Sequence, residues 1–176
     1  MLEPATGIVR LQSGEALRSR YVLVDRTMNL DGRVVSGNRA AGAGMRLYEA
    51  SQPVTIRERI LGLYADGWSG PEMVYTRYGC KGGVLVLILI GSNDLRPSPA
   101  RVVARSEGRV LAQTLVGEAA ERFRIPLRSA GGVCEVKLAV SPVVVPADIL
   151  DAPDPRATDI RPLGVRARAF TFVESG

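Results

Sequence analysis

Aromatic rings and carboxylates are concentrated in one stretch of the chain, residues 63–78. It holds four of the nine aromatic residues, including the only tryptophan: Tyr64, Trp68, Tyr75 and Tyr78. Two carboxylates, Asp66 and Glu72, lie among these rings. A sugar packs its C–H face on an aromatic ring, while its hydroxyl groups need oriented acceptors and donors. The stretch therefore predicts a carbohydrate-binding site with Trp68 as the stacking platform, the tyrosines as its neighbours and the carboxylates as hydroxyl acceptors.

The same rings also fit a purely structural role. Trp and Tyr are often partly buried at the end of a core, with their polar tips in water. In that alternative the chain is a structural or protein-docking domain without a glycan site. The exposure of Trp68 distinguishes the two, because a ring lying flat on the surface favours sugar and a buried ring favours packing.

Catalysis has little support in the sequence. The chain contains no histidine, which excludes a Ser-His-Asp or Cys-His set and removes the commonest general base. A glycosidase needs two carboxylates facing each other across roughly 5 to 9.5 Å. Asp66 and Glu72 are the pair to consider, so a small glycoside hydrolase is the least favoured alternative, and we expect no catalytic residue in this chain.

No cofactor is expected, and calcium is the one metal worth weighing. Asp151, Asp154 and Asp159 lie in a Pro/Asp-rich segment, and carboxylate oxygens suit Ca²⁺. Their spacing matches no EF-hand loop, and Asp-Pro pairs commonly form turns. We therefore favour solvated turn residues here, or a salt bridge between Asp159 and Arg161 that holds the segment in place.

The positive charge of the chain does not indicate nucleic-acid binding. The net charge is +5, and Lys81 and Lys137 are the only lysines. The arginines are scattered singly with acids between them, whereas a nucleic-acid groove needs clustered basic residues interleaved with aromatics. A nucleic-acid partner is therefore not expected.

Two cysteines, Cys80 and Cys134, leave two arrangements open. They either form a disulfide between neighbouring strands or remain two buried thiols. A domain of this size has enough core to be stable without a disulfide, so the sequence slightly favours the thiols. Without histidine, they cannot form an ordinary structural zinc site.

Alternation of apolar and polar residues predicts an all-β chain. It is clear in residues 54–60, 134–140 and 165–172, as expected for antiparallel strands with one buried face. Residues 101–112 indicate a hairpin closed at 106–108, and 122–127 a further strand. The apolar run 85–90 predicts a central strand covered on both faces. Together with 19 glycines and 11 prolines, these strands favour an antiparallel β-sandwich of jelly-roll type.

The chain length of 176 residues suits one domain, which we place at residues 45–173. Residues 1–44, which end in a run of small residues, are expected to be a looser leading segment or a linker from a preceding region. Single helical turns are expected at 118–121 and 146–150. The first residues show no apolar run typical of a secretory signal, and the run 84–90 is far shorter than a membrane span.

Three short motifs resemble a known bacterial module. They are Met45-Arg46-Leu47-Tyr48, residues 61–70 (LGLYADGWSG) and residues 159–165 (DIRPLGV). Together they resemble the C-terminal extracytoplasmic β-sandwich of large polytopic glycosyltransferases that use lipid-phosphate sugars. The likeness spans about residues 45–173.

This resemblance implies a carbohydrate-binding-like accessory domain outside the membrane, which binds or positions cell-envelope glycan. Its partners would be a glycan and the membrane part of the same parent protein. The catalytic acid of such transferases lies between membrane helices, so the resemblance transfers no catalytic residue to this chain.

Overall fold

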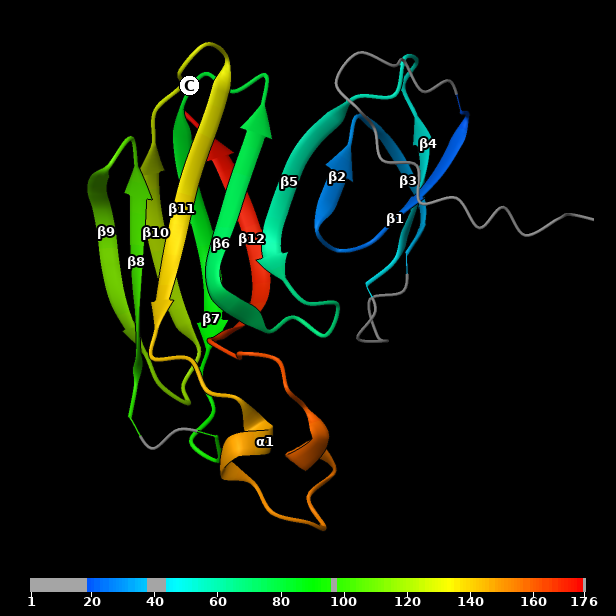
Figure 1. Ribbon diagram of the computed structural model, residues 1–176. Helices are drawn as coiled ribbons and strands as arrows, with labels where there is room; N and C mark the ends of the chain where they lie inside the picture. Colours follow the sequence, from blue (N-terminus) through cyan, green and yellow to red (C-terminus); the bar gives the residue numbers. More distant parts are fainter. Residues whose placement is uncertain (1–18, 38–43, 96–97, 176) are drawn as a thin grey trace, which may run out of the picture.

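The computed structural model describes residues 19–37, 44–95 and 98–175 and is built mainly of strands (Figure 1). The first strands are β1 (Tyr21–Val24), β2 (Met28–Leu30), β3 (Gly32–Gly37), β4 (Arg46–Ala50), β5 (Ile56–Leu63) and β6 (Ser69–Tyr78). The later strands are β7 (Gly83–Ile90), β8 (Ala100–Ser106), β9 (Arg109–Val116), β10 (Glu121–Leu127), β11 (Val133–Ser141) and β12 (Arg166–Glu174). Helix α1 (Pro146–Ile149) and the 3₁₀ turn η1 (Pro155–Thr158) lie between β11 and β12.

Two antiparallel sheets form the body of the protein. A six-stranded sheet has the order β2-β5-β6-β11-β8-β9, and a three-stranded sheet has the order β10-β7-β12. One continuous core joins them, with Met73, Val136 and Leu138 from the large sheet and Leu87 and Ile125 from the small one. The expected all-β antiparallel sandwich is thereby confirmed.

Local alternation explains which side chains enter this core. In β11, Cys134, Val136, Leu138 and Val140 are buried while the residues between them are exposed. Such a strand places every second side chain in the interior. The long apolar run forms β7 in the centre of the small sheet, as expected.

The two faces of β7 differ more than its sequence suggests. Leu85, Leu87 and Leu89 point into the sandwich and are fully buried. On the other face, Ile88 and Ile90 are only half-buried, so the expected complete cover of both faces is wrong. Val86, on the same face, is 6% exposed, so that face is partly covered.

The predicted hairpin is present as β8 and β9, with Glu107 and Gly108 at its tip. Both residues have positive φ, 49° and 76°, as a tight two-residue turn requires. The expected turn near residue 146 is the single turn of α1. The helical turn expected at 118–121 is absent, because Glu121 already pairs with Leu89 in β10.

Cys80 and Cys134 form a disulfide, so the slight preference for free thiols is wrong. Cys134 lies opposite Arg77 in the β6–β11 register, and Cys80 follows the end of β6. The backbone N–H of Cys80 donates to the carbonyl of Gly132, which brings the two Cα atoms to 5.7 Å. This distance is typical of a disulfide.

The described residues before β4 also form strands. Strands β1 and β3 pair with β4 in a separate three-stranded sheet beside the sandwich. Strand β2 instead extends the six-stranded sheet by pairing with β5 (Figure 1). The division near residue 44 stays a prediction, and most of the small-residue run that ends there lies outside the described residues. No helix in the described ranges has the length and apolar character needed to cross a membrane.

Candidate functional site

The turn between β5 and β6 brings together three of the predicted site residues, Tyr64, Asp66 and Trp68. The Tyr64 N–H donates to the Trp68 carbonyl at 2.8 Å, and the Gly67 N–H donates to the Tyr64 carbonyl at 2.9 Å. The Trp68 N–H donates to Oδ1 of Asp66 at 3.3 Å, which fixes the carboxylate against its own backbone. We call Tyr64, Asp66 and Trp68 the turn cluster.

Glycines allow the chain to take this path. Gly62 has a φ of +74° in a bulge of β5, and a Cβ there would lie 1.9 Å from the Glu72 carbonyl oxygen. Gly67 has a φ of +92°, and a Cβ there would lie 2.6 Å from the guanidinium of Arg26. Only glycine adopts these positions without strain or collision.

Arg161 joins the turn cluster from the loop that precedes β12. Its Nη2 lies 2.8 Å from Oδ2 of Asp66 and 2.7 Å from Oδ2 of Asp159. Its guanidinium also lies over the Tyr64 ring, with Cζ 4.9 Å from the ring centroid. The salt bridge expected between Asp159 and Arg161 is therefore present, and it extends to Asp66.

These contacts keep the three groups charged. Partial burial acts to raise the pKa of Asp66, but the hydrogen bonds from Arg161 and from the Trp68 N–H outweigh it, so the pKa is lowered. The hydrogen bond from Arg161 also lowers the pKa of Asp159. In turn, Asp159 and Asp66 raise the pKa of Arg161 above its usual value.

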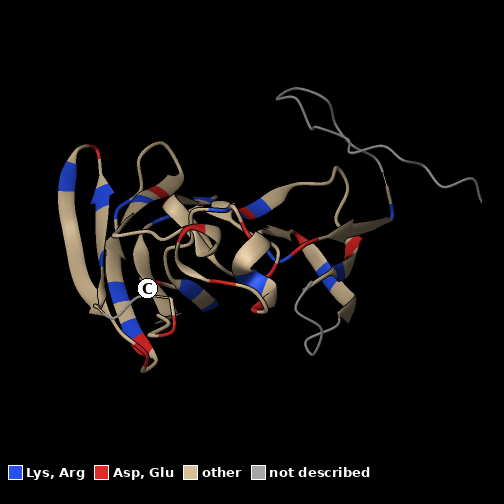
Figure 2. Ribbon diagram, turned by 60° about the horizontal axis from the view of Figure 1, so that its bottom comes forward, with Lys and Arg blue, Asp and Glu red and all other residues tan. Residues whose placement is uncertain are grey.

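Two further arginines surround the turn. Arg26 donates from Nη2 to the Ala167 carbonyl at 2.7 Å, and Arg166 donates from Nε to the Asp66 carbonyl at 3.3 Å. Burial, followed by the charge of Arg166, lowers the pKa of Arg26. Basic and acidic segments are interspersed over the ribbon in Figure 2. Arginine donors thus surround the rings and the carboxylate of the turn cluster.

Tyr75 lies in the core, away from the turn cluster. It is 1% exposed, its ring stacks on Phe172, and its hydroxyl donates to Oε1 of Glu58 at 3.0 Å. Burial, then the charge of Glu58, raises the pKa of this hydroxyl. Arg77 pairs with the same Glu58 and with Glu174. Tyr75 therefore belongs to a buried polar network that connects the two sheets.

Tyr78 and Glu72 lie on the outward face of the large sheet. Tyr78 is 40% exposed at the end of β6 opposite to the turn cluster, where it pairs with Val133. Glu72 is exposed and pairs with Ala139. The structure thus divides the predicted residues among the turn, the core and this outer face.

Trp68 itself is half-buried. A fully exposed ring would favour a stacking platform and a buried ring a packing residue, and the exposure of Trp68 lies between these two cases. The exposure of Trp68 therefore does not decide between the two roles.

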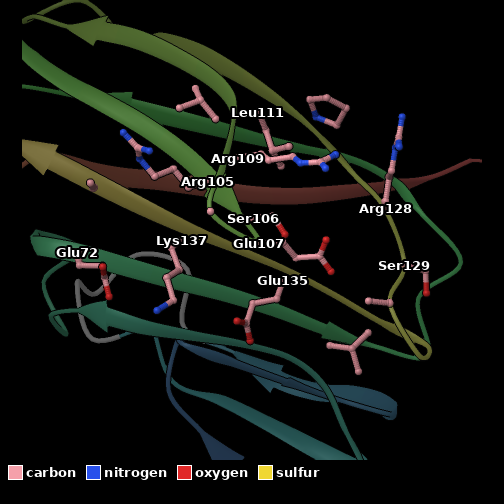
Figure 3. A pocket seen from close by; sticks show the side chains of 16 residues that line it. Glu72, Arg105, Ser106, Glu107, Arg109, Leu111, Arg128, Ser129, Glu135 and Lys137 are labelled. Atoms are coloured by element: carbon pink, nitrogen blue, oxygen red, sulfur yellow. The ribbon is translucent and has the colours of Figure 1, made fainter.

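Glu72 lines a large open hollow that sequence reasoning did not detect (Figure 3). The hollow has a volume of about 1120 Å³. Its walls are the β8–β9 hairpin tip and the start of the β10–β11 connection, and its floor is the outer face of β6 and β11. Arg105 and Lys137 line it as well. Both occupy outward positions of predicted strands, but only the strand register shows that they are neighbours.

The three aspartates considered for calcium do not converge. Asp154 accepts from the backbone and side chain of Arg156, which lowers its pKa to about 2, and Asp159 is bound to Arg161. Asp151 is exposed. In the described ranges, no group of three or more His, Cys, Asp or Glu side chains is placed to hold a metal ion.

Comparison with known sequences shows no related family. No family model matches the chain, and no curated protein matches it.

Comparison with solved structures gives similarities at low sequence identity. The CBM36-1 domain of a multidomain xylanase from the hindgut metagenome of Trinervitermes trinervoides is 13% identical; the match covers 89% of this chain and 98% of that one, with a TM-score of 0.37. A family 6 carbohydrate-binding module is 11% identical over 92% and 99%, with a TM-score of 0.34. The enzymatically active domain of tailspike protein 4 of bacteriophage CBA120 is 10% identical over 88% and 20%, with a TM-score of 0.30. At TM-scores below 0.5, these likenesses carry no argument about function.

Proposed function

We propose that this chain is a non-catalytic carbohydrate-binding domain and that the turn cluster is its glycan site. The observation that carries the proposal is the β5–β6 turn, in which the backbone N–H of the only tryptophan donates to the Asp66 carboxylate. Arg161, itself bound by two carboxylates, binds the same Asp66. Trp68 supplies an apolar ring surface beside oriented acceptors and donors, which a sugar needs at the same time.

The charged partners are fixed before a ligand arrives. Arg161 is bound by two carboxylates and packs on Tyr64, so a sugar does not have to order it. Arginine has five N–H donors, and each carboxylate has lone pairs beyond those used by Arg161. Preorganised groups of this kind reduce the entropy lost on binding. We expect dissociation constants of about 10 µM to 1 mM, because a shallow sugar site exchanges hydrogen bonds with water for hydrogen bonds with protein.

We further propose that the domain lies outside the cytoplasm and positions cell-envelope glycan for the membrane part of a glycosyltransferase. The support for this context is the resemblance of residues 45–48, 61–70 and 159–165 to the accessory β-sandwich of such enzymes. The transfer chemistry would belong to the membrane part.

One observation favours the structural alternative. Arg161 already occupies one oxygen of Asp66 and one face of Tyr64, and Trp68 is half-buried. These contacts would also suit a cluster whose role is to anchor the loop before β12. A glycan site requires that the remaining acceptors and the open part of the Trp68 ring bind ligand.

A glycan array of cell-envelope polysaccharides and oligosaccharides, probed with the purified chain, tests the proposal. Hits are titrated with intrinsic fluorescence as the readout, because the single tryptophan reports directly on the proposed platform. Saturable binding with a change in Trp68 emission supports the site. Binding to no glycan by folded protein favours the structural alternative.

A further inference from the structure

We propose that the hollow beside the β8–β9 hairpin is a second binding site, which takes an acidic polysaccharide through its carboxylate or phosphate groups. This site goes beyond the glycan site at the turn cluster and does not depend on Trp68. It is centred on Arg105 of β8 and Lys137 of β11 (Figure 3).

Two like charges face each other across neighbouring strands in the hollow. Arg105 and Lys137 are direct partners in the β8–β11 register, so both side chains project from the same face. Directly opposed residues have Cβ atoms about 4.5 to 5.5 Å apart, and like charges at this distance are destabilising. The pair therefore does not stabilise the unliganded protein. An anion bound between Arg105 and Lys137 would attract both side chains and offset their mutual repulsion.

The cationic side chains of the hollow have no carboxylate partner among the described residues. Arg109 and Arg128 line the same hollow from the hairpin and from the start of the β10–β11 connection. Throughout residues 19–37, 44–95 and 98–175, no hydrogen bond or ion pair is found for the side chains of Arg105, Arg109, Arg128 or Lys137. By contrast, Arg77, Arg156 and Arg161 are each bound by carboxylates. The guanidinium groups of the hollow are therefore free to bind carboxylate or phosphate through paired N–H donors.

The lining of the hollow suits an acidic polysaccharide better than a nucleic acid. Glu72, Glu107 and Glu135 lie among the cations and would repel a continuous phosphate backbone. Among the described residues no aromatic side chain lines the hollow, so bases would find no stacking surface. Carboxylates in the same hollow need hydrogen-bond donors, and sugar hydroxyl groups supply them. A ligand with both anions and hydroxyl groups meets both requirements.

The shape of the hollow suits a chain segment. It is open along the outer face of β6 and β11, where Glu72, Lys137 and Glu135 follow one another (Figure 3). Successive same-face positions along a strand are separated by about 6.5 Å. Sugar units of a polymer lying along this face would each meet a different charged side chain.

The test measures binding of the whole 176-residue chain to immobilised polygalacturonate, which carries carboxylates, and to phosphomannan, which carries phosphates; both polymers also carry sugar hydroxyl groups. Neutral dextran and oligo-dT are measured in parallel, all at fixed ionic strength. The variant Arg105→Gln with Lys137→Gln is compared with Arg122→Gln with Arg124→Gln. The second pair is exposed on β10 and outside the hollow, and its replacement removes the same net charge.

We expect wild-type protein to bind at least one of the two polyanions and to ignore dextran, and the polyanion that binds identifies the anionic group. The Arg105/Lys137 variant should bind at least about tenfold more weakly, while the Arg122/Arg124 variant should stay within about twofold. Trp68→Ala should retain polyanion binding even if it loses neutral glycans, so the two sites fail independently. Three results would each overturn the proposal: equally weakened polyanion binding in the two double variants, no binding of folded wild-type protein to either polyanion, or tighter binding to oligo-dT than to the polyanions.

Discussion

Arg161 and Asp66 are 95 residues apart in the chain, yet Nη2 of Arg161 lies 2.8 Å from Oδ2 of Asp66. Oδ2 of Asp159 lies 2.7 Å from the same nitrogen. The contact ties the loop before β12 to the β5–β6 turn, and it places a cation over Tyr64 and next to the turn that carries Trp68. The geometry of the turn cluster therefore depends on the loop that carries Arg161.

Replacing Trp68 with alanine should remove neutral glycan binding and leave the sandwich folded, because one stacking ring carries a large share of a small polar site. Tyr21→Ala is the matched control, since Tyr21 is an exposed ring on β1. Array binding and far-UV circular dichroism are compared for both variants. Unchanged binding by Trp68→Ala would place the glycan site elsewhere.

Arg161→Gln should reduce the dependence of stability on acid pH. The pKa values of Asp66 and Asp159 are lowered from 3.8 in the folded protein, so their contribution is present above that value and is lost as pH falls through the lowered values. Urea unfolding at several pH values should show the variant less stable than wild type near pH 6, with the difference closing towards pH 2. Arg168→Gln, at an exposed position of β12, should follow wild type throughout. A constant difference at all pH values would contradict the prediction.

Leu87→Asp should prevent soluble expression. Leu87 is fully buried in β7 between Phe123 and Phe170, and an unpaired charge buried there costs several kcal/mol. Thr171→Asp is the control, because Thr171 is exposed on the neighbouring β12. Soluble and folded Leu87→Asp would show that the interior of the sandwich is elsewhere.

Removing the disulfide with Cys80→Ser and Cys134→Ser should lower the free energy of unfolding by up to about 4 kcal/mol, from the loop entropy of a separation of 54 residues. Urea unfolding with and without reductant measures the effect, and intact mass checks the bridge. Two free thiols in unreduced protein from an oxidising compartment would mean that the bridge does not form.

Arg105→Glu should stabilise the unliganded protein by up to about 1 kcal/mol while abolishing polyanion binding. The new carboxylate would face Lys137 and replace a like-charge pair with an opposite one. Thermal unfolding measures the gain, and Arg122→Glu serves as the charge-matched control. A loss of stability in Arg105→Glu would mean that Arg105 has a structural role.

The strands were predictable where the signal is local. Alternation in β11 and the Glu107-Gly108 tip of β8–β9 are each readable within a few residues. The separation of Glu72 from Tyr75 also follows from local parity, because residues three apart in one strand face opposite sides. Treating residues 63–78 as one surface overlooked this constraint.

The partners of the site residues were not predictable, because they come from distant parts of the chain. Arg161 reaches Asp66 because the loop before β12 lies beside the β5–β6 turn, where the Gly164 N–H donates to the Ser69 carbonyl. Arg105 meets Lys137 only in the β8–β11 register. The disulfide likewise depends on the β6–β11 pairing. Tertiary pairing, not local propensity, positions these groups.

The position of β12 at the end of the strand order affects how the sandwich folds during synthesis. This strand forms one flank of β7, and it follows every other strand in the described part of the chain (Figure 1). During synthesis from the N-terminus, the leucines of β7 remain open along that flank until residues 166–174 have left the ribosome. Such long-range pairing makes folding slow and exposes apolar surface in the meantime. We therefore expect nascent chains lacking β12 to bind chaperones and not to fold. Pairing of β12 with β7 would then be the step that completes folding of the sandwich.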